Sequence, residues 1–275
     1  MGEPIGWLEA IILGVIQGLT EFLPISSSAH VLIASQLFGW QDPGAAFTAV
    51  IQIGTEAAVL LYFRRDLLRI ARSWARSLGP RRRSTPESRL GWFIIVGTIP
   101  IVVLGVTFAQ QIETAARNLW LVAVVLIVFG LLLGVVDRIG SKVRGLDTMR
   151  TRDGIVLGFG QALALIPGVS RSGATITTGL ALGFSREAAT RYSFLLAIPA
   201  VLGAGFYEAT KIGSNSTVAW GPTLVATAIS FTVGYAVISW LLRYISTHSF
   251  LPFVVYRVVL GSVILVLLSL GVLSA

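Results

Sequence analysis

The chain has 275 residues, of which 55% are hydrophobic and 12% charged, with a formal net charge of +8 and no cysteine. A soluble domain carries about 25% charged residues, so a soluble core cannot absorb this much apolar surface. Disulfides and cysteine-ligated zinc or iron–sulfur centres are excluded. The positive charge does not indicate nucleic acid as a partner, because most Lys and Arg crowd into two connecting segments of an otherwise apolar chain. The composition therefore indicates an integral membrane protein.

The chain opens with an apolar segment that polar residues interrupt. No basic residue occurs in Met1 to Pro4, and no small-residue cleavage signature follows, so we expect this segment to stay in the mature protein. The apolar run breaks at Pro24 and a serine cluster, and then resumes. Such an interruption favours a re-entrant helix hairpin over a single straight span.

A second segment resembles the first at a constant offset. Ile11 to Leu19 aligns with Ile155 to Leu163, an offset of 144 positions, and at the same offset Ser26 aligns with Ser170. The second serine cluster also follows a proline, Pro167. One chain that resembles itself in this way indicates a duplicated half with a second re-entrant hairpin.

Three ordinary spans follow each hairpin and are predicted to cross the membrane. They are Phe47 to Phe63, Trp92 to Ala109 and Leu119 to Val136 in the first half, and Tyr192 to Tyr207, Pro222 to Leu242 and Phe253 to Leu273 in the second. About 20 helical residues cross the hydrocarbon layer. The sequence thus predicts an all-α, polytopic membrane protein with six transmembrane helices and two re-entrant hairpins. It forms a single membrane domain, 1–275, with inverted halves of approximately 1–140 and 150–275.

The two basic segments set the predicted orientation. Nine arginines lie between Arg64 and Arg89, and five Lys or Arg residues lie between Asp137 and Asp153. By the positive-inside rule both segments are cytoplasmic. Because each half crosses the membrane three times, the second half is inverted relative to the first. Both termini then lie on the outer side, and the hairpins enter from opposite faces.

The first hairpin carries a polar cluster made of Gln17, Glu21, the serines 26–28 and His30. Gln17 and Glu21 are four residues apart and share one face of a helix. An ionisable group in hydrocarbon costs about 3 kcal/mol on insertion scales, so Glu21 and His30 are functional candidates that face protein or water. The alternative is a serine run that caps a helix, with a structural histidine.

The second hairpin carries hydroxyl groups around Arg171. Pro167 and Gly168 end one helix, the serines cap the next, and the free N–H groups at its start favour an anion. Arg171 adds a permanent charge and a planar fork that matches two phosphate oxygens. Long uncharged stretches on both sides disfavour an arginine that snorkels to the membrane edge. Glu56, inside a predicted span, lines the site or makes a structural hydrogen bond, and the sequence leaves both open.

The two clusters resemble those of the bacterial undecaprenyl-diphosphate phosphatase family, also called the bacitracin-resistance family. The residues that carry the resemblance are Gln17 with Glu21, the segment Pro24 to His30, and the segment Pro167 to Thr175. The resemblance spans the whole chain, and the last segment is the most specific. Family members often have Glu at the position of Gln17, so Glu21 is the firmer acid here.

The resemblance implies removal of the terminal phosphate of a polyprenyl diphosphate lipid, undecaprenyl diphosphate, with a divalent cation. This reaction returns the lipid carrier to peptidoglycan synthesis and confers bacitracin resistance. It also implies a multi-pass protein of the bacterial cytoplasmic (inner) membrane, in contact with membrane lipids, whose site opens to the outer, periplasmic side.

The residue chemistry fits this reaction, because loss of a terminal phosphoryl group depends mainly on positioning and charge neutralisation. Arg171 supplies charge, and Glu21 is an oxygen donor for Mg²⁺, with Ca²⁺ as the other candidate. Gln17 is expected to hold a metal-bound water. The hydroxyls expected to contact substrate with Arg171 are those of Ser26, Ser28, Ser170, Ser172 and Thr175.

The sequence leaves the attacking group open. His30 attacks phosphorus itself, or it deprotonates Ser27 or a water that attacks instead. In each version His30 must be neutral, so activity is expected to fall in acid with an apparent pKa near the imidazole reference of about 6.5.

Two other functions compete with the phosphatase. A transporter or flippase of a phosphorylated lipid or of phosphate would use the same inverted hairpins and Arg171. It would have little use for His30 beside serines and a carboxylate. A purely structural membrane scaffold would tolerate alanine at Glu21, His30 and Arg171. The sequence does not fix the oligomeric state, so a homo-oligomer stays open.

Overall fold

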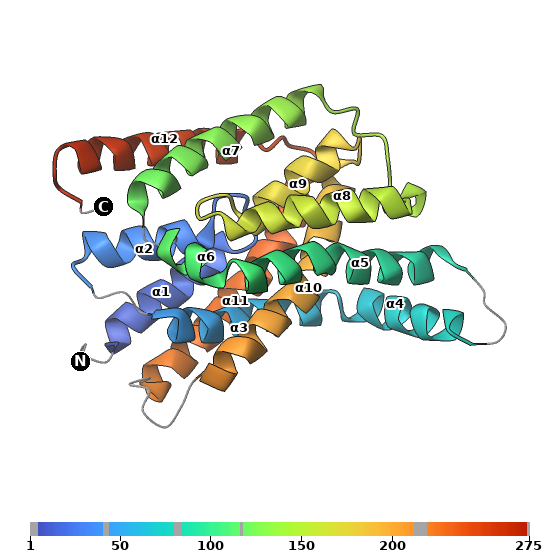
Figure 1. Ribbon diagram of the computed structural model, residues 1–275, viewed down its shortest axis with the longest axis horizontal. Helices are drawn as coiled ribbons and strands as arrows, with labels where there is room; N and C mark the ends of the chain where they lie inside the picture. The colour runs from blue at the N-terminus through green and yellow to red at the C-terminus, as the bar shows by residue number, and fades with distance from the viewer. Residues whose placement is uncertain (1–4, 41–43, 80–83, 116–117, 212–218, 274–275) are drawn as a thin grey trace.

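The computed structural model describes residues 5–40, 44–79, 84–115, 118–211 and 219–273, and this part of the chain is helical (Figure 1). Within these ranges the β-type pairing is limited to an isolated bridge between Arg144 and Phe184. The predicted all-α class is therefore confirmed. The predicted start of the mature chain, Met1 to Pro4, lies outside the described residues.

The helices follow the order that the sequence predicts. The first hairpin is α1 (Trp7–Thr20) and α2 (Ser27–Leu37), and the second is α8 (Thr151–Ala162) and α9 (Arg171–Ala181). The predicted spans correspond to α3 (Gly44–Tyr62), α5 (Pro86–Thr107), α7 (Leu119–Ile139), α10 (Arg186–Lys211), α11 (Trp220–Ile245) and α12 (Leu251–Ser269). The connecting elements are α4 (Arg64–Ser77), α6 (Ala109–Ala115) and the 3₁₀ turns η1 (Leu146–Thr148) and η2 (Leu163–Leu165).

Within the described residues, five helices are long and apolar enough to cross a membrane, namely α5, α7, α10 as far as Gly205, α11 and α12. A polytopic membrane protein is therefore confirmed. The sixth predicted span corresponds to α3, whose apolar stretch Phe47–Tyr62 is shorter and includes Gln52 and Glu56. The sixth crossing thus stays a prediction.

The two hairpins occupy opposite halves of the bundle. In Figure 1, α1 and α2 lie toward the end where α12 finishes, whereas α8 and α9 lie toward the opposite end, where α7 finishes. Their turns approach each other near the middle of the molecule. Each hairpin thus brings a chain reversal, with its free backbone groups, into the interior of the protein.

The helices of the two halves pack reciprocally. Helix α1 packs along α11, while its counterpart α8 packs along α5, the counterpart of α11. Glycines permit both approaches: a Cβ on Gly14 would lie 2.6 Å from the carbonyl oxygen of Ala226, and one on Gly158 would lie 2.6 Å from that of Gly97. Gly14 and Gly158 are separated by the same 144 positions as the other repeated residues. Small residues allow this backbone contact in membrane helix packing.

Polar links gather at the end where α4 lies. The basic segment after α3, expected only as a connection, forms the amphipathic helix α4 against α5, with Ile70 buried. The carboxylate of Asp137 accepts hydrogen bonds from the Nε of Arg186 at 2.6 Å and from the backbone N–H of Phe250 at 3.0 Å. These bonds join the end of α7 to the starts of α10 and α12. Ser185 caps the start of α10, since its Oγ accepts from the N–H of Ala188 at 3.1 Å.

Candidate active site

The turns of the two hairpins are bonded to each other. The hydroxyl of Ser172, in the first turn of α9, donates a hydrogen bond of 3.0 Å to the carbonyl of Leu23. Ser26 and Ser170, just before α2 and α9, both have positive φ angles, of 75° and 72°. Only a small fraction of non-glycine residues adopts this region, and functional sites hold many of them.

Glu21 is the centre of the polar contacts. Its Oε2 accepts hydrogen bonds from the hydroxyl of Ser27 at 2.6 Å and from the Nε2 of Gln17 at 2.8 Å. Its Oε1 accepts a short hydrogen bond from the guanidinium of Arg171. The residues that the sequence placed in separate clusters therefore meet, since Ser27 begins α2 and Arg171 begins α9.

A second carboxylate lies beside the same arginine. An Oε1 of Glu56 on α3 is 3.6 Å from the Nη2 of Arg171, and the side chain is only 1% exposed. Neither of its oxygens has a hydrogen-bond partner among the described residues. Arg171 thus bridges two acids that belong to different helices.

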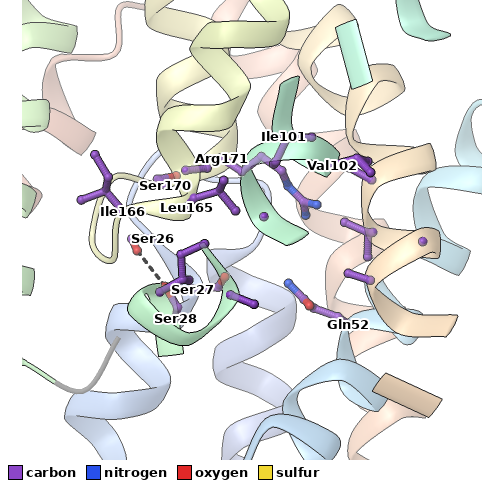
Figure 2. A pocket seen from close by; sticks show the side chains of 18 of the residues that line it. Ser26, Ser27, Ser28, Gln52, Ile101, Val102, Leu165, Ile166, Ser170 and Arg171 are labelled. Carbon is purple, nitrogen blue, oxygen red and sulfur yellow. Dashed lines mark hydrogen bonds between the residues drawn. The ribbon is translucent and has the colours of Figure 1, made fainter. Parts of the chain in front are cut away.

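A cavity of about 570 Å³ opens beside this cluster. Figure 2 shows Ser27 and Ser28 on one side, Ser170 and Arg171 on another, and Gln52 nearby. The remaining wall is mostly apolar and comes from the second half of α5, from α6, from α10 and from residues 164–166 at η2. One cavity therefore joins a charged and hydroxyl-lined region to an apolar region.

The structure brings most of the predicted site residues to this cavity. Its walls include Glu21, Ser26, Ser27, Ser28, Ser170 and Arg171. Four other predicted residues, Gln17, His30, Ser172 and Thr175, do not line it within the described part of the chain. The hydroxyl of Thr175 donates to the carbonyl of Arg171 at 3.0 Å, so it supports the helix start. The functional roles of all these residues stay predictions.

His30 points to α12. Its Nδ1 lies 2.7 Å from the carbonyl oxygen of Ser26, and its Nε2 lies 2.7 Å from the hydroxyl of Tyr256. The two rings are stacked, with centroids 5.5 Å apart and planes 7° from parallel. Both ring nitrogens are therefore engaged outside the cavity wall.

The sequence analysis missed Arg257, which follows Tyr256 on α12. Its fully buried guanidinium donates hydrogen bonds of 2.9 to 3.1 Å to four backbone carbonyl oxygens. One belongs to Pro24 in the first turn, two belong to Gly168 and Val169 in the second, and the last belongs to Leu126 on α7. A lone arginine inside an apolar span was the available signal, but it does not reveal carbonyl partners.

The donor set near the cavity suits a hard cation that shares its coordination with substrate. Among the described residues no three His, Cys, Asp or Glu side chains gather as a complete metal site. Glu21 and Glu56 both form ion pairs with Arg171, and Gln17 is hydrogen-bonded to Glu21. Three side chains with oxygen atoms therefore lie close together. Mg²⁺ is commonly held by one or two carboxylates together with substrate phosphates.

The fold and the site define a multi-spanning membrane protein in which two helix hairpins place an arginine, an acid and hydroxyls on a partly apolar cavity. This chain belongs to the family of the bacitracin resistance protein BacA, whose family model matches residues 10–263. The family resemblance inferred from the motifs is therefore confirmed.

Several similar proteins align with this chain over nearly their whole length, and their names agree. An undecaprenyl-diphosphatase of Nocardioides sp. is 59% identical over 273 residues, covering 98% of this chain and 100% of that protein. An undecaprenyl-diphosphatase 2 of Agrobacterium fabrum is 58% identical over 275 residues, covering 98% of each chain. An undecaprenyl-diphosphatase 2 of Streptomyces coelicolor is 54% identical over 281 residues, covering 98% of this chain and 97% of that protein.

Proposed function

We propose that this protein hydrolyses undecaprenyl diphosphate to undecaprenyl phosphate and inorganic phosphate, the activity that the names of its relatives state. The observation that carries the proposal is the meeting of Arg171 with Glu21 and Ser27 beside one cavity. A diphosphate needs positive charge and positioning, and a hydroxyl bonded to a carboxylate supplies a nucleophile with its base.

The two regions of the cavity fit the two parts of the substrate. The diphosphate lies against Arg171 and the serines. On binding, it replaces Glu21 as the partner of the Arg171 guanidinium. The polyprenyl chain leaves along the apolar wall made by α5, α6 and α10. Apolar residues such as Val102 and Val106 are 48% and 76% exposed there and are available to a lipid chain.

Ser27 is the attacking group that this geometry supports best. Its Oγ already donates to Oε2 of Glu21 at 2.6 Å, whereas His30 makes its contacts elsewhere. The Oγ bonds to the terminal phosphorus, the bond from that phosphorus to the bridging oxygen breaks, and the serine proton passes to Glu21. Water then cleaves the phosphoserine, releasing inorganic phosphate and restoring the hydroxyl.

Glu21, with Gln17 beside it, would hold the divalent cation, for which Mg²⁺ or Ca²⁺ is expected. Such a cation neutralises phosphate charge when it is bound. The protein's own part is to present carboxylate and amide oxygens next to Arg171, so that positive charge surrounds the diphosphate from two sides.

The protein acts in the bacterial cytoplasmic membrane with its cavity open to the outer side. The exposed arginines of α4 lie at the opposite end of the bundle from the start of α1, as the positive-inside rule requires (Figure 1). In this orientation the halves are inverted, both termini are outside, and the product returns to peptidoglycan synthesis. The transporter alternative is not favoured, because the relatives are named as diphosphatases.

The decisive experiment measures inorganic phosphate released from a long-chain isoprenyl diphosphate by the purified protein in detergent with Mg²⁺. Arg171→Ala and Ser27→Ala are expected to abolish phosphate release. A thermal unfolding measurement is expected to show that both variants are still folded. Ser35→Ala is the matched control, because Ser35 is on the same helix and, within the described residues, its hydroxyl bonds only the carbonyl of Val31, at 3.0 Å. A wild type that binds the lipid without releasing phosphate would overturn the proposal and favour a transporter.

A trapping experiment tests the nucleophile. The substrate is labelled in its terminal phosphate, and the protein is quenched during turnover. Acid-stable label that disappears in Ser27→Ala is the expected result, because phosphoserine survives acid. Acid-labile label that disappears in His30→Ala would assign the attack to His30 instead.

A further inference from the structure

The contacts of His30 determine which ring nitrogen carries its proton. A backbone carbonyl only accepts hydrogen bonds, so the Nδ1 that lies 2.7 Å from the Ser26 oxygen must be the N–H donor. In a neutral imidazole the other nitrogen is then an acceptor. The hydroxyl of Tyr256, 2.7 Å from Nε2, therefore donates its proton to that nitrogen.

This arrangement leaves His30 without a free ring nitrogen. Nδ1–H is committed to Ser26, and the lone pair of Nε2 is committed to Tyr256. A base or nucleophile would need that lone pair directed at the substrate. Because His30 does not line the cavity in the described structure, its contribution must act through the residues that it holds.

The residue that His30 holds is the strained one. Ser26 has a φ of 75°, and its side chain makes no capping bond to α2. Its carbonyl receives both the ring Nδ1–H and, at 3.3 Å, the backbone N–H of His30. Ser27, the next residue, carries the hydroxyl that meets Glu21. The orientation of Ser26 therefore sets where Ser27 begins the helix.

We infer that Tyr256 is a positioning residue for the reaction: its hydroxyl fixes the Nδ1–H tautomer of His30, and His30 braces the strained Ser26 turn that presents Ser27. The kinetic part of this inference rests on the proposed function, whereas the tautomer does not. Tyr256 acts from α12, 226 positions away along the chain.

Nuclear magnetic resonance of the protein labelled with ¹⁵N in its histidine rings tests the tautomer, since the chain has only two histidines. The His30 signals, identified by their loss in His30→Asn, are expected to show a protonated Nδ1 and a hydrogen-bonded, unprotonated Nε2. In Tyr256→Phe the ¹⁵N chemical shift of Nε2 is expected to move to that of an unprotonated ring nitrogen that accepts no hydrogen bond. A protonated Nε2 in the wild type, or an Nε2 signal that Tyr256→Phe leaves in place, would overturn the inference.

Tyr244→Phe is the matched control. Tyr244 stacks on His248, the other histidine, with centroids 4.5 Å apart and planes 15° from parallel. Within the described part of the chain, His248 contacts the backbone carbonyl of Tyr244, at 3.2 Å from its Nδ1, and not the Tyr244 hydroxyl. Tyr244→Phe should therefore leave the His30 signals and the phosphate release unchanged, and a change in either would show that the readout is not specific.

Kinetics separate a brace from a nucleophile. Tyr256→Phe is expected to lower kcat about five-fold, the effect of one hydrogen bond, with little change in KM. Asn places an amide N–H near the position of Nδ1–H, whereas Gln does not, so His30→Asn should retain more activity than His30→Gln. Equal loss in both, in folded protein, would contradict the brace. If even the wild type releases no phosphate, the proposed function fails while the spectra still decide the tautomer.

Discussion

The two hairpin turns share one backbone shape but are fastened differently. Both have a serine at positive φ and a contact between serine hydroxyls, 3.3 Å from Ser26 to Ser28 and 3.1 Å from Ser170 to Ser172. The Oγ of Ser170 caps α9 by accepting from the N–H of Gly173 at 3.2 Å, whereas Ser26 makes no such bond. The first turn therefore leaves the hydroxyl of Ser26 free of a capping bond, although both Ser26 and Ser170 line the cavity.

The first helical turn of each hairpin differs in the same way, because the second hairpin is again the more strongly hydrogen-bonded one. Asp153, in the first turn of α8, accepts from the N–H of Arg150 at 2.9 Å and from the guanidinium of Arg144 at 2.5 Å. Among the described residues, its counterpart Glu9 accepts only a longer, exposed bond of 3.4 Å from the N–H of Gly6. The more firmly bonded hairpin supplies the anchored arginine, and the other supplies the acid and the proposed nucleophile. Functional sites often contain polar groups that would increase stability if they capped a helix instead.

The largest expected effect removes the feature that the turns share. Arg257→Leu would leave carbonyls of both turns without donors, and we expect a loss of at least about 3 kcal/mol in unfolding free energy, or failure to fold. Thermal unfolding in detergent, followed by tryptophan fluorescence, measures it. Arg243→Leu is the control, because Arg243 is exposed and its guanidinium bonds only the hydroxyl of Ser239 among the described residues. An unchanged Tm for Arg257→Leu would mean that the turns hold themselves.

A smaller effect tests whether the hairpins are gripped equally. Gly14→Ala and Gly158→Ala should each lower stability by about 1–3 kcal/mol, because either Cβ would meet a backbone oxygen at 2.6 Å. Comparable losses in Tm are expected from the reciprocal packing. Gly203→Ala serves as a control for stability, since nothing lies within 4 Å of its added Cβ. A loss at one glycine alone would break the equivalence of the halves.

The capping difference predicts an asymmetric pair of alanine variants. Ser170→Ala loses a cap worth about 1 kcal/mol, whereas Ser26→Ala loses none. The positive φ remains in both variants, so its strain cancels in the comparison. Both variants lose a contact between serine hydroxyls, so we expect the larger loss in Tm for Ser170→Ala, which also loses the cap. Equal shifts would show that the cap does not distinguish the turns.

The smallest effect depends on pH. Burial alone would raise the pKa of the Asp153 carboxyl, but hydrogen bonds from Arg144 and from the Arg150 backbone, with the charges of both, hold that pKa below its usual range. A lowered folded pKa contributes stability above the unfolded value of about 3.9, and that stability is lost as pH falls through the folded pKa.

Asp153→Asn should therefore lower the Tm at pH 7 by an amount equivalent to about 1 kcal/mol, and its gap from the wild type should close in acid. Glu9→Gln should show a smaller gap at pH 7, because its bond is longer and exposed. A gap for Asp153→Asn that widens as the pH falls would reverse the assigned sign.

The sequence predicted the features that leave a periodic or repeated pattern. The matching serines and prolines located both hairpins, and Arg171, singled out within uncharged stretches, pairs with Glu21 of the first hairpin. Arg257 was missed because its partners are backbone carbonyls, which every residue carries. The partner of His30 was missed because Tyr256 meets it only through tertiary packing. The sequence left the role of Glu56 open. In the structure Glu56 pairs with Arg171 but does not line the cavity.

The reciprocal packing also sets the order in which the protein can assemble during synthesis. Helix α1 packs along α11, and roughly 200 residues separate them. At ribosomal rates of about 5–20 residues per second, α1 waits on the order of 10–40 s for that partner. Meanwhile Gln17 and Glu21 can bond each other but lack Arg171, which is made about 150 positions after Glu21. The first hairpin is therefore the segment whose insertion is expected to depend most on the translocon or a chaperone.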